Sequence, residues 1–249
     1  MWTLLHGFTG SPESYDRVVR DLGSEQRPLI PFLTGHGLDW RGRAADSFES
    51  EVSRLLDLLS DIEPPRFLCG YSLGARVALG MLSRAPTMFD GAVLIGLHPG
   101  LEAKSARDER RALDAQRARL LREDGLAAFI ESWESLPLFA SQRGLASNLR
   151  VEQRDCRLAH DPDGLARSLE VLGLAEMPNY RGAMASLEVP ITLMTGALDI
   201  KFSKIAKELS KQNVHIQAEQ VDGVGHNVLL EAPSAVAAAL RRVAELAQP

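Results

Sequence analysis

The sequence has 249 residues, of which 45% are hydrophobic and 24% are charged, and its formal net charge at pH 7 is −5. A chain of this length and composition can bury the core of one domain, so these values exclude an intrinsically disordered protein. The acidic balance excludes a general basic surface for nucleic acid or for an anionic membrane.

Short apolar runs alternate with helical patterns along the chain, which predicts a mostly parallel sheet with helices on both faces, the α/β fold class. The predicted strands are residues 2–5, 28–32, 67–70, 92–96, 191–195 and 214–218. The predicted helices are residues 13–22, 47–62, 73–84, 203–211 and 234–247. In such sheets a ligand binds outside the carboxyl ends of the strands, so we search the loops that follow them.

The alternation stops between about residues 98 and 188, where Arg, Glu, Ala and Leu predominate. We interpret residues 99–185 as a helical cap inserted over the strand ends, and residues 1–98 and 186–249 as the core. This stretch holds twelve arginines, so it is where we expect local positive charge. Most of these arginines are expected to lie on solvated helix faces.

Residues 70–76 read GYSLGAR and place Ser72 between two glycines at a predicted turn from strand to helix. G-x-S-x-G in this context is typical of a nucleophile elbow, a strained turn that exposes the serine hydroxyl above the sheet. The pattern alone is weak, and an ordinary strand-to-helix loop is the alternative.

A serine hydroxyl needs an imidazole to accept its proton and a carboxylate to orient that imidazole. His226 follows the last predicted strand between flexible neighbours, and Asp199 follows the strand 191–195. The chain order Ser, Asp, His is the one expected for an α/β-hydrolase. The rival bases are His6, His36, His98, His160 and His215, and the rival acids are Asp90 and Asp222.

Two backbone N–H groups are needed for an oxyanion hole. In this fold they belong to the residue after the nucleophile, here Leu73, and to the loop after the first visible strand, where we expect Phe8. Arg76 lies four residues after Ser72, so both can occupy one side of the first helical turn. A guanidinium there suits an anionic substrate, and a surface arginine paired with an acid is the alternative.

The stretches LHGFTGS, LTGHG, GYSLGAR and VGHN make the chain resemble the α/β-hydrolase superfamily over nearly its whole length. Within that superfamily it is most similar to the 2-succinyl-6-hydroxy-2,4-cyclohexadiene-1-carboxylate (SHCHC) synthases of menaquinone biosynthesis. The matching stretches are GYSLGAR, HPGL with the Arg-rich residues after it, Trp133 with PLFAS, NLR at 148–150, GLA at 173–175 with Pro178, and LDIKF at 198–202.

The resemblance implies a lyase that eliminates pyruvate from a cyclohexene bearing several carboxylates. Ser72, activated by His226 and Asp199, would abstract a proton beside the succinyl carbonyl, and the oxyanion hole would stabilise the enolate. The resemblance also implies a set of substrate-binding residues. They are Arg76, Arg110, Arg150, Tyr71, Trp133 and Lys201.

Two features depart from the family pattern. A tyrosine often follows the cap tryptophan, whereas Glu134 stands here, so either this acid points away from an anionic substrate or the local contacts differ. The family core usually has two further strands before the one that bears the HGF sequence. We expect these first strands to be missing from the sheet.

The chain holds two cysteines, Cys69 and Cys156, which argues against a disulfide framework and favours a reducing cytoplasm. We expect no signal peptide, membrane span, nucleic-acid partner, metal or other cofactor, and we expect a monomer that acts on a small polyanionic metabolite. Two alternatives stay open, a serine carboxylester or carbon–carbon bond hydrolase for a small anionic substrate, and a non-catalytic binding protein of the same fold.

Overall fold

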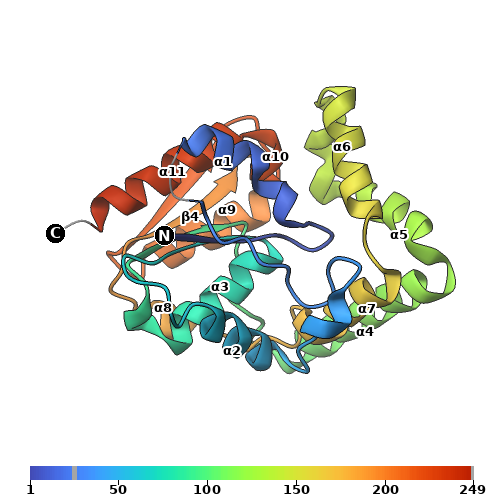
Figure 1. The fold of residues 1–249 in the computed structure, drawn as a ribbon, viewed down its shortest axis with the longest axis horizontal. Helices are drawn as coiled ribbons and strands as arrows, with labels where there is room; N and C mark the ends of the chain where they lie inside the picture. The colour runs from blue at the N-terminus through green and yellow to red at the C-terminus, as the bar shows by residue number, and fades with distance from the viewer. Residues whose placement is uncertain (24–26, 248–249) are drawn as a thin grey trace.

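The computed structural model describes residues 1–23 and 27–247, in which a five-stranded parallel sheet lies between two layers of helices (Figure 1). Its strand order is β1-β2-β3-β4-β5. The strands are β1 (Trp2–Leu5), β2 (Phe67–Tyr71), β3 (Gly91–Ile95), β4 (Ile191–Gly196) and β5 (Ile216–Val221). The predicted α/β fold class is confirmed, and β1 (Trp2–Leu5) is one edge strand of the sheet.

The helices fall into two groups along the chain. Those that accompany the sheet are α1 (Asp16–Leu22), α2 (Phe48–Leu58), α3 (Leu73–Arg84), α9 (Ile200–Ser210), α10 (Val228–Glu231) and α11 (Pro233–Leu246). Those between β3 and β4 are α4 (Lys104–Glu123), α5 (Gly125–Glu134), α6 (Ser147–Leu158), α7 (Pro162–Leu172) and α8 (Arg181–Met184). Four short 3-10 helices complete the described elements, η1 (Pro12–Tyr15), η2 (Trp40–Arg43), η3 (Pro86–Met88) and η4 (Pro137–Gly144). Within residues 1–23 and 27–247, no helix has both the length and the apolar character required to cross a bilayer.

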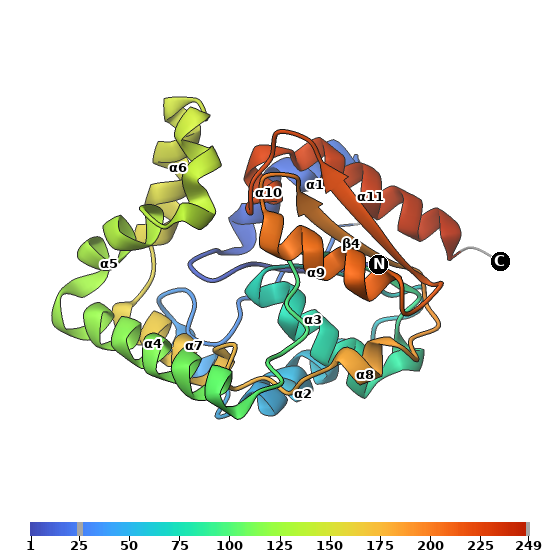
Figure 2. The same ribbon diagram turned by 180° about the vertical axis from the view of Figure 1, so that it is seen from behind.

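The two faces of the sheet bury separate apolar layers, because successive side chains of a strand point to opposite faces. Leu68, Leu94 and Leu193 pack with α2, α3 and α9. Cys69 and Val93 pack on the other face, with α1 and α11. Figures 1 and 2 show these helices on opposite sides of the strands. The strand ends therefore emerge from a core that is buried on both faces.

The predicted strand at residues 28–32 is wrong. Only Leu29 forms a bridge, parallel to Thr3 of β1, where its N–H donates to the Trp2 carbonyl and its carbonyl accepts from Leu4 N–H, both at 2.9 Å. Pro28 and Pro31 flank this position and have no N–H to donate, so the ladder cannot extend along the edge.

The helices α4, α5 and α7 form the cap and enclose a small apolar core of their own. Leu121 of α4, Ile130 of α5 and Leu165 of α7 are fully buried in it. Figure 2 shows these helices, with α6, grouped at one end of the molecule beyond the sheet. The extent of the cap, residues 99–185, stays a prediction.

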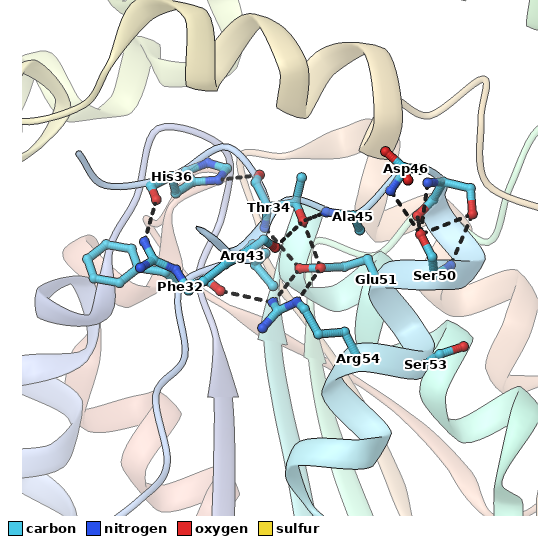
Figure 3. A network of polar contacts seen from close by, with 12 residues as sticks. Phe32, Thr34, His36, Arg43, Ala45, Asp46, Ser50, Glu51, Ser53 and Arg54 are labelled. Carbon is cyan, nitrogen blue, oxygen red and sulfur yellow. Dashed lines mark hydrogen bonds and ion pairs between the residues drawn. The ribbon is translucent and has the colours of Figure 1, made fainter. Parts of the chain in front are cut away.

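The loop after residue 32 is fixed from below by Glu51 of α2, which is fully buried (Figure 3). Its carboxylate accepts from the backbone N–H and the hydroxyl of Thr34, at 2.9 and 2.8 Å. Arg54 donates to both of its oxygens, from Nε at 2.8 Å and from an Nη at 2.9 Å, and also donates to the Phe32 carbonyl. This bidentate pair holds His36 and its neighbours beside the strand ends.

Candidate active site

Ser72 stands at the turn between β2 and α3 in a conformation that L-residues rarely adopt, with φ 53° and ψ −103°. The chain permits this turn because two glycines let backbone segments come close together. A Cβ on Gly70 would lie 2.4 Å from the Gly74 carbonyl oxygen, and a Cβ on Gly74 would lie 2.0 Å from that of Leu5. The two flanking glycines are therefore required by packing, and the strained turn exposes the serine hydroxyl at the carboxyl end of β2.

Three side chains from different loops form one hydrogen-bonded row. The Nε2 atom of His226 lies 3.0 Å from Ser72 Oγ, and its Nδ1 atom lies 2.6 Å from Asp199 Oδ2. His226 and Asp199 are buried, 2% and 7% exposed. The carboxylate fixes the imidazole with a proton on Nδ1, so Nε2 is free to accept the serine proton.

Except for His98, which lines the same cavity as Ser72, the rival residues lie elsewhere. Asp90 accepts from Arg66 N–H at the opposite ends of the strands. His6, His36 and His160 form a buried cluster with ring centroids 4.6 and 5.4 Å apart. Burial is the main cause that lowers the pKa of each of these imidazoles, to about 4 for His6.

Two further rivals also lie outside the row. Asp222 lies in the turn that follows β5, and His215 lies in the turn before β5 rather than inside a strand as expected.

Phe8 and Leu73 line the space next to the serine, as an oxyanion hole requires. Neither backbone N–H has a hydrogen-bond acceptor within the parts of the chain that the structure describes. The loop that carries Phe8 is held by His6, whose Nδ1 donates to the Gly7 carbonyl at 2.9 Å and whose Nε2 accepts from Leu33 N–H at 3.2 Å. These two amides are therefore available to an oxyanion.

A cavity of about 220 Å³ lies between the strand ends and the cap. Arg76 partly lines it and donates to the Leu172 carbonyl at 2.7 Å, and no carboxylate partner for it occurs in residues 1–23 and 27–247. Burial, followed by the charge of Arg110, lowers the pKa of its guanidinium, which stays protonated at neutral pH. This partly buried cation, with no acid paired to it among the described residues, lines the same cavity as the serine, so the site favours an anion.

The other predicted binding residues divide into two sets. Tyr71, Arg110, Trp133 and Lys201 line this cavity with Arg76. Arg150 is exposed on α6 and is outside the residues that line the cavity. Its predicted role in substrate binding is therefore not supported by its position.

Glu134 does not face the cavity. Its carboxylate is paired with Arg154 and, at 3.0 Å, with Arg157. Arg157 is 5% exposed and lies over the Phe139 ring, 5.2 Å from its centroid. Of the two alternatives considered for Glu134, the first therefore holds. The acid points away from the cavity, and the two arginines neutralise its charge.

Sequence reasoning missed two polar residues of the cavity, Arg117 and Ser168, and named a third, His98, only as a rival base. Burial, followed by the charge of Lys201, lowers the pKa of His98 to about 4, so this side chain is neutral. The sequence held a signal for Arg117, because it lies seven residues after Arg110 and so shares its helix face. Ser168 had none, since its place depends on how α7 packs. The described residues contain no group of His, Cys, Asp and Glu side chains arranged to hold a metal ion.

Comparisons with known proteins agree with this geometry. The model of the alpha/beta hydrolase family matches residues 4–239. The putative SHCHC synthase of Bacillus subtilis (strain 168) is 34% identical over 233 residues, which are 92% of this chain and 84% of that protein. The SHCHC synthase of Enterobacter sp. (strain 638) is 34% identical over 97% of this chain and 90% of its own length.

A solved structure of MenH from S. aureus superposes with a TM-score of 0.93 at 26% identity, covering 100% of this chain and 94% of that one. The likeness therefore extends over core and cap together. The chain belongs to the alpha/beta hydrolase family and, within it, to the SHCHC synthases.

Proposed function

We propose that this protein is a carbon–oxygen lyase of menaquinone biosynthesis, which eliminates pyruvate from 2-succinyl-5-enolpyruvyl-6-hydroxy-3-cyclohexene-1-carboxylate to give 2-succinyl-6-hydroxy-2,4-cyclohexadiene-1-carboxylate. One observation carries the proposal beyond the family. The hydrogen-bonded row Ser72, His226 and Asp199 opens into a cavity where Arg76 has no acid partner among the described residues. A proton-abstracting group thus faces a place for a carboxylate.

The row of side chains supplies the base. His226 accepts the Ser72 proton, and the serine oxygen removes the proton from ring carbon 2, beside the succinyl carbonyl. The amides of Phe8 and Leu73 stabilise the negative charge that develops on that carbonyl oxygen. The electron pair moves through the ring double bond and breaks the bond between carbon 5 and oxygen, which releases enolpyruvate. Enolpyruvate takes up a proton to become pyruvate, and the ring is left as the 2,4-diene.

The cations supply orientation. Arg76 binds one carboxylate of the substrate with two parallel hydrogen bonds, which places ring carbon 2 against the serine oxygen. Lys201 adds positive potential from α9, and Arg110 does so from the cap. Tyr71 and Trp133 form apolar walls, and burial raises the pKa of the Tyr71 hydroxyl, so it stays neutral.

We further propose that the protein acts in the cytoplasm, as a monomer and without nucleic acid. The two walls of the cavity come from one chain, so no second copy is needed to complete the site. No step of the proposed reaction needs a metal or another cofactor. Size-exclusion chromatography with light scattering tests the monomer, because a mass of about twice 27.2 kDa would contradict it.

The proposed reaction is tested by assaying pyruvate release continuously from freshly made substrate, with a short-chain neutral nitrophenyl ester assayed in parallel. We expect fast pyruvate release and negligible ester cleavage. Ester cleavage without pyruvate release above background would instead make the protein a serine hydrolase that shares the scaffold.

A further inference from the structure

Two arginines of the cap share a single carboxylate at the edge of the cavity. Asp114 of α4 is 4% exposed. Its Oδ2 atom lies 2.7 Å from Arg110 Nε, and its Oδ1 atom lies 3.3 Å from an Nη of Arg117. Both arginines line the cavity. The unit of one acid and two guanidinium groups therefore keeps a net positive charge at the cavity wall.

The arrangement keeps the arginines side by side. They lie at positions i and i+7 of α4 with the acid at i+4, so all three occupy one helix face. The Arg117 guanidinium lies over the Trp133 ring, 5.1 Å from its centroid. Burial, followed by the charge of Arg110, lowers the pKa of Arg117, as expected for two like charges held close together.

Arginines on the outer side of α4 are neutralised differently. Arg111 pairs with Asp108 and Glu176, and Arg122 pairs with Asp163 and Glu170. Each of these two arginines thus has two acids. The two arginines at the cavity share one acid, so their part of the cavity wall is short of negative charge.

We propose that Arg117 is a further specificity-determining residue, which contacts a second carboxylate of the substrate directly beside Arg110. This subsite for the second carboxylate lies on the cap side of the cavity and Arg76 lies on the core side, so two carboxylates of one molecule are held from opposite walls. This inference rests on the polyanionic substrate of the proposed function. The repulsion between the two guanidinium groups is greatest where water is excluded, and a bound carboxylate offsets it.

The test uses propane-1,2,3-tricarboxylate as a probe and isothermal titration calorimetry as the readout, so no turnover is needed. Arg117→Ala is compared with Arg119→Ala, a matched control that removes an exposed arginine of the same helix. We expect Arg117→Ala to raise the Kd of the probe at least about tenfold and Arg119→Ala to change it less than about twofold. Arg117→Lys, which keeps the charge without the planar fork, should fall between them.

Equal Kd values for the two alanine variants, or no binding by the unaltered protein, would overturn the subsite. Thermal unfolding of each variant shows whether it is folded, and the lysine variant gives the comparison if Arg117→Ala is not. If the probe binds through Arg117 but no pyruvate is released from the substrate, the subsite stands and the proposed function fails.

Discussion

The two walls of the cavity are built in different ways. On the core side, Ser72, Asp199 and His226 follow strand ends, and backbone geometry and direct hydrogen bonds fix them. On the cap side, Arg110 and Arg117 project from one helix face and are held by a shared acid. In the proposed reaction the core wall supplies the base and binds one carboxylate through Arg76, and the cap wall binds a second carboxylate.

The largest effect should follow from breaking the core wall. His226→Ala removes the proton acceptor of Ser72, and we expect pyruvate release to fall about 10⁴- to 10⁶-fold. The loss of pyruvate release caused by Asp199→Asn should lie at the lower end of that range, because the imidazole is then held in the wrong tautomer. Both are measured as kcat of pyruvate release, with circular dichroism to confirm the fold. Retention of more than a tenth of the activity by His226→Ala would show that the row is not the base.

The next effect concerns the cation on the core side. Arg76→Ala should lower kcat/KM for the polyanionic substrate roughly 30- to 1000-fold, because a desolvated ion pair with the substrate is lost. This corresponds to a loss of about 2–4 kcal/mol of transition-state stabilisation. Cleavage of a neutral nitrophenyl ester, however slow, should change far less. Equal losses on both substrates would contradict the role of Arg76 in binding a carboxylate.

An effect of about the same free energy, on stability instead of turnover, is expected beneath the core wall. Glu51→Ala leaves the Thr34 amide and hydroxyl and the Arg54 guanidinium without their shared partner, so the free energy of unfolding should fall by about 2–4 kcal/mol. Urea unfolding measures it, and Glu49→Ala, on the same helix, is the control. An unchanged midpoint would show that the network in Figure 3 does not hold the loop.

The smallest expected effect is the change in the free energy of unfolding per pH unit. Burial is the main cause that lowers the folded-state pKa of His6 to about 4, whereas the unfolded value is near 6.5, so the unfolded chain binds more protons between these values. His36, which it contacts, is lowered in the same direction. The contribution of these buried neutral histidines to the free energy of unfolding should therefore be complete above about pH 6.5. It should fall as the pH drops towards 4, by up to about 1.4 kcal/mol per pH unit for each histidine.

Urea unfolding at a series of pH values measures this slope. His36→Gln should make it shallower. The same slope with and without this imidazole would contradict its burial as the neutral form.

The positions of the core-side residues could be predicted from the sequence alone, because the topology of a parallel sheet leaves few loops in which they can lie. Ser72, Asp199 and His226 follow β2, β4 and β5, and the carboxyl ends of parallel strands meet at one edge. The strand at residues 28–32 was mispredicted because its apolar pattern hid the effect of two prolines on an edge ladder. Local pattern does not report which strand lies at the edge.

The cap wall was harder to predict because its residues meet through helix packing. Arg110 lies on α4 and Arg150 on α6, yet only Arg110 lines the cavity, and no residue of α6 is among its lining residues. Figure 1 shows α6 at the far end of this group of helices. Arg117 was recoverable from its spacing to Arg110. The pairing of Glu134 with Arg154 and Arg157 was not, because it joins α5 to α6 across the chain.

The most direct test of the reaction compares pyruvate release by the unaltered protein and by Ser72→Ala at equal concentrations of folded enzyme, with the substrate limiting. We expect the unaltered protein to release one pyruvate per substrate rapidly, and Ser72→Ala to release it no faster than the uncatalysed background. Equal rates for the two proteins, both above background, would contradict proton abstraction by the serine and place the base elsewhere in the cavity.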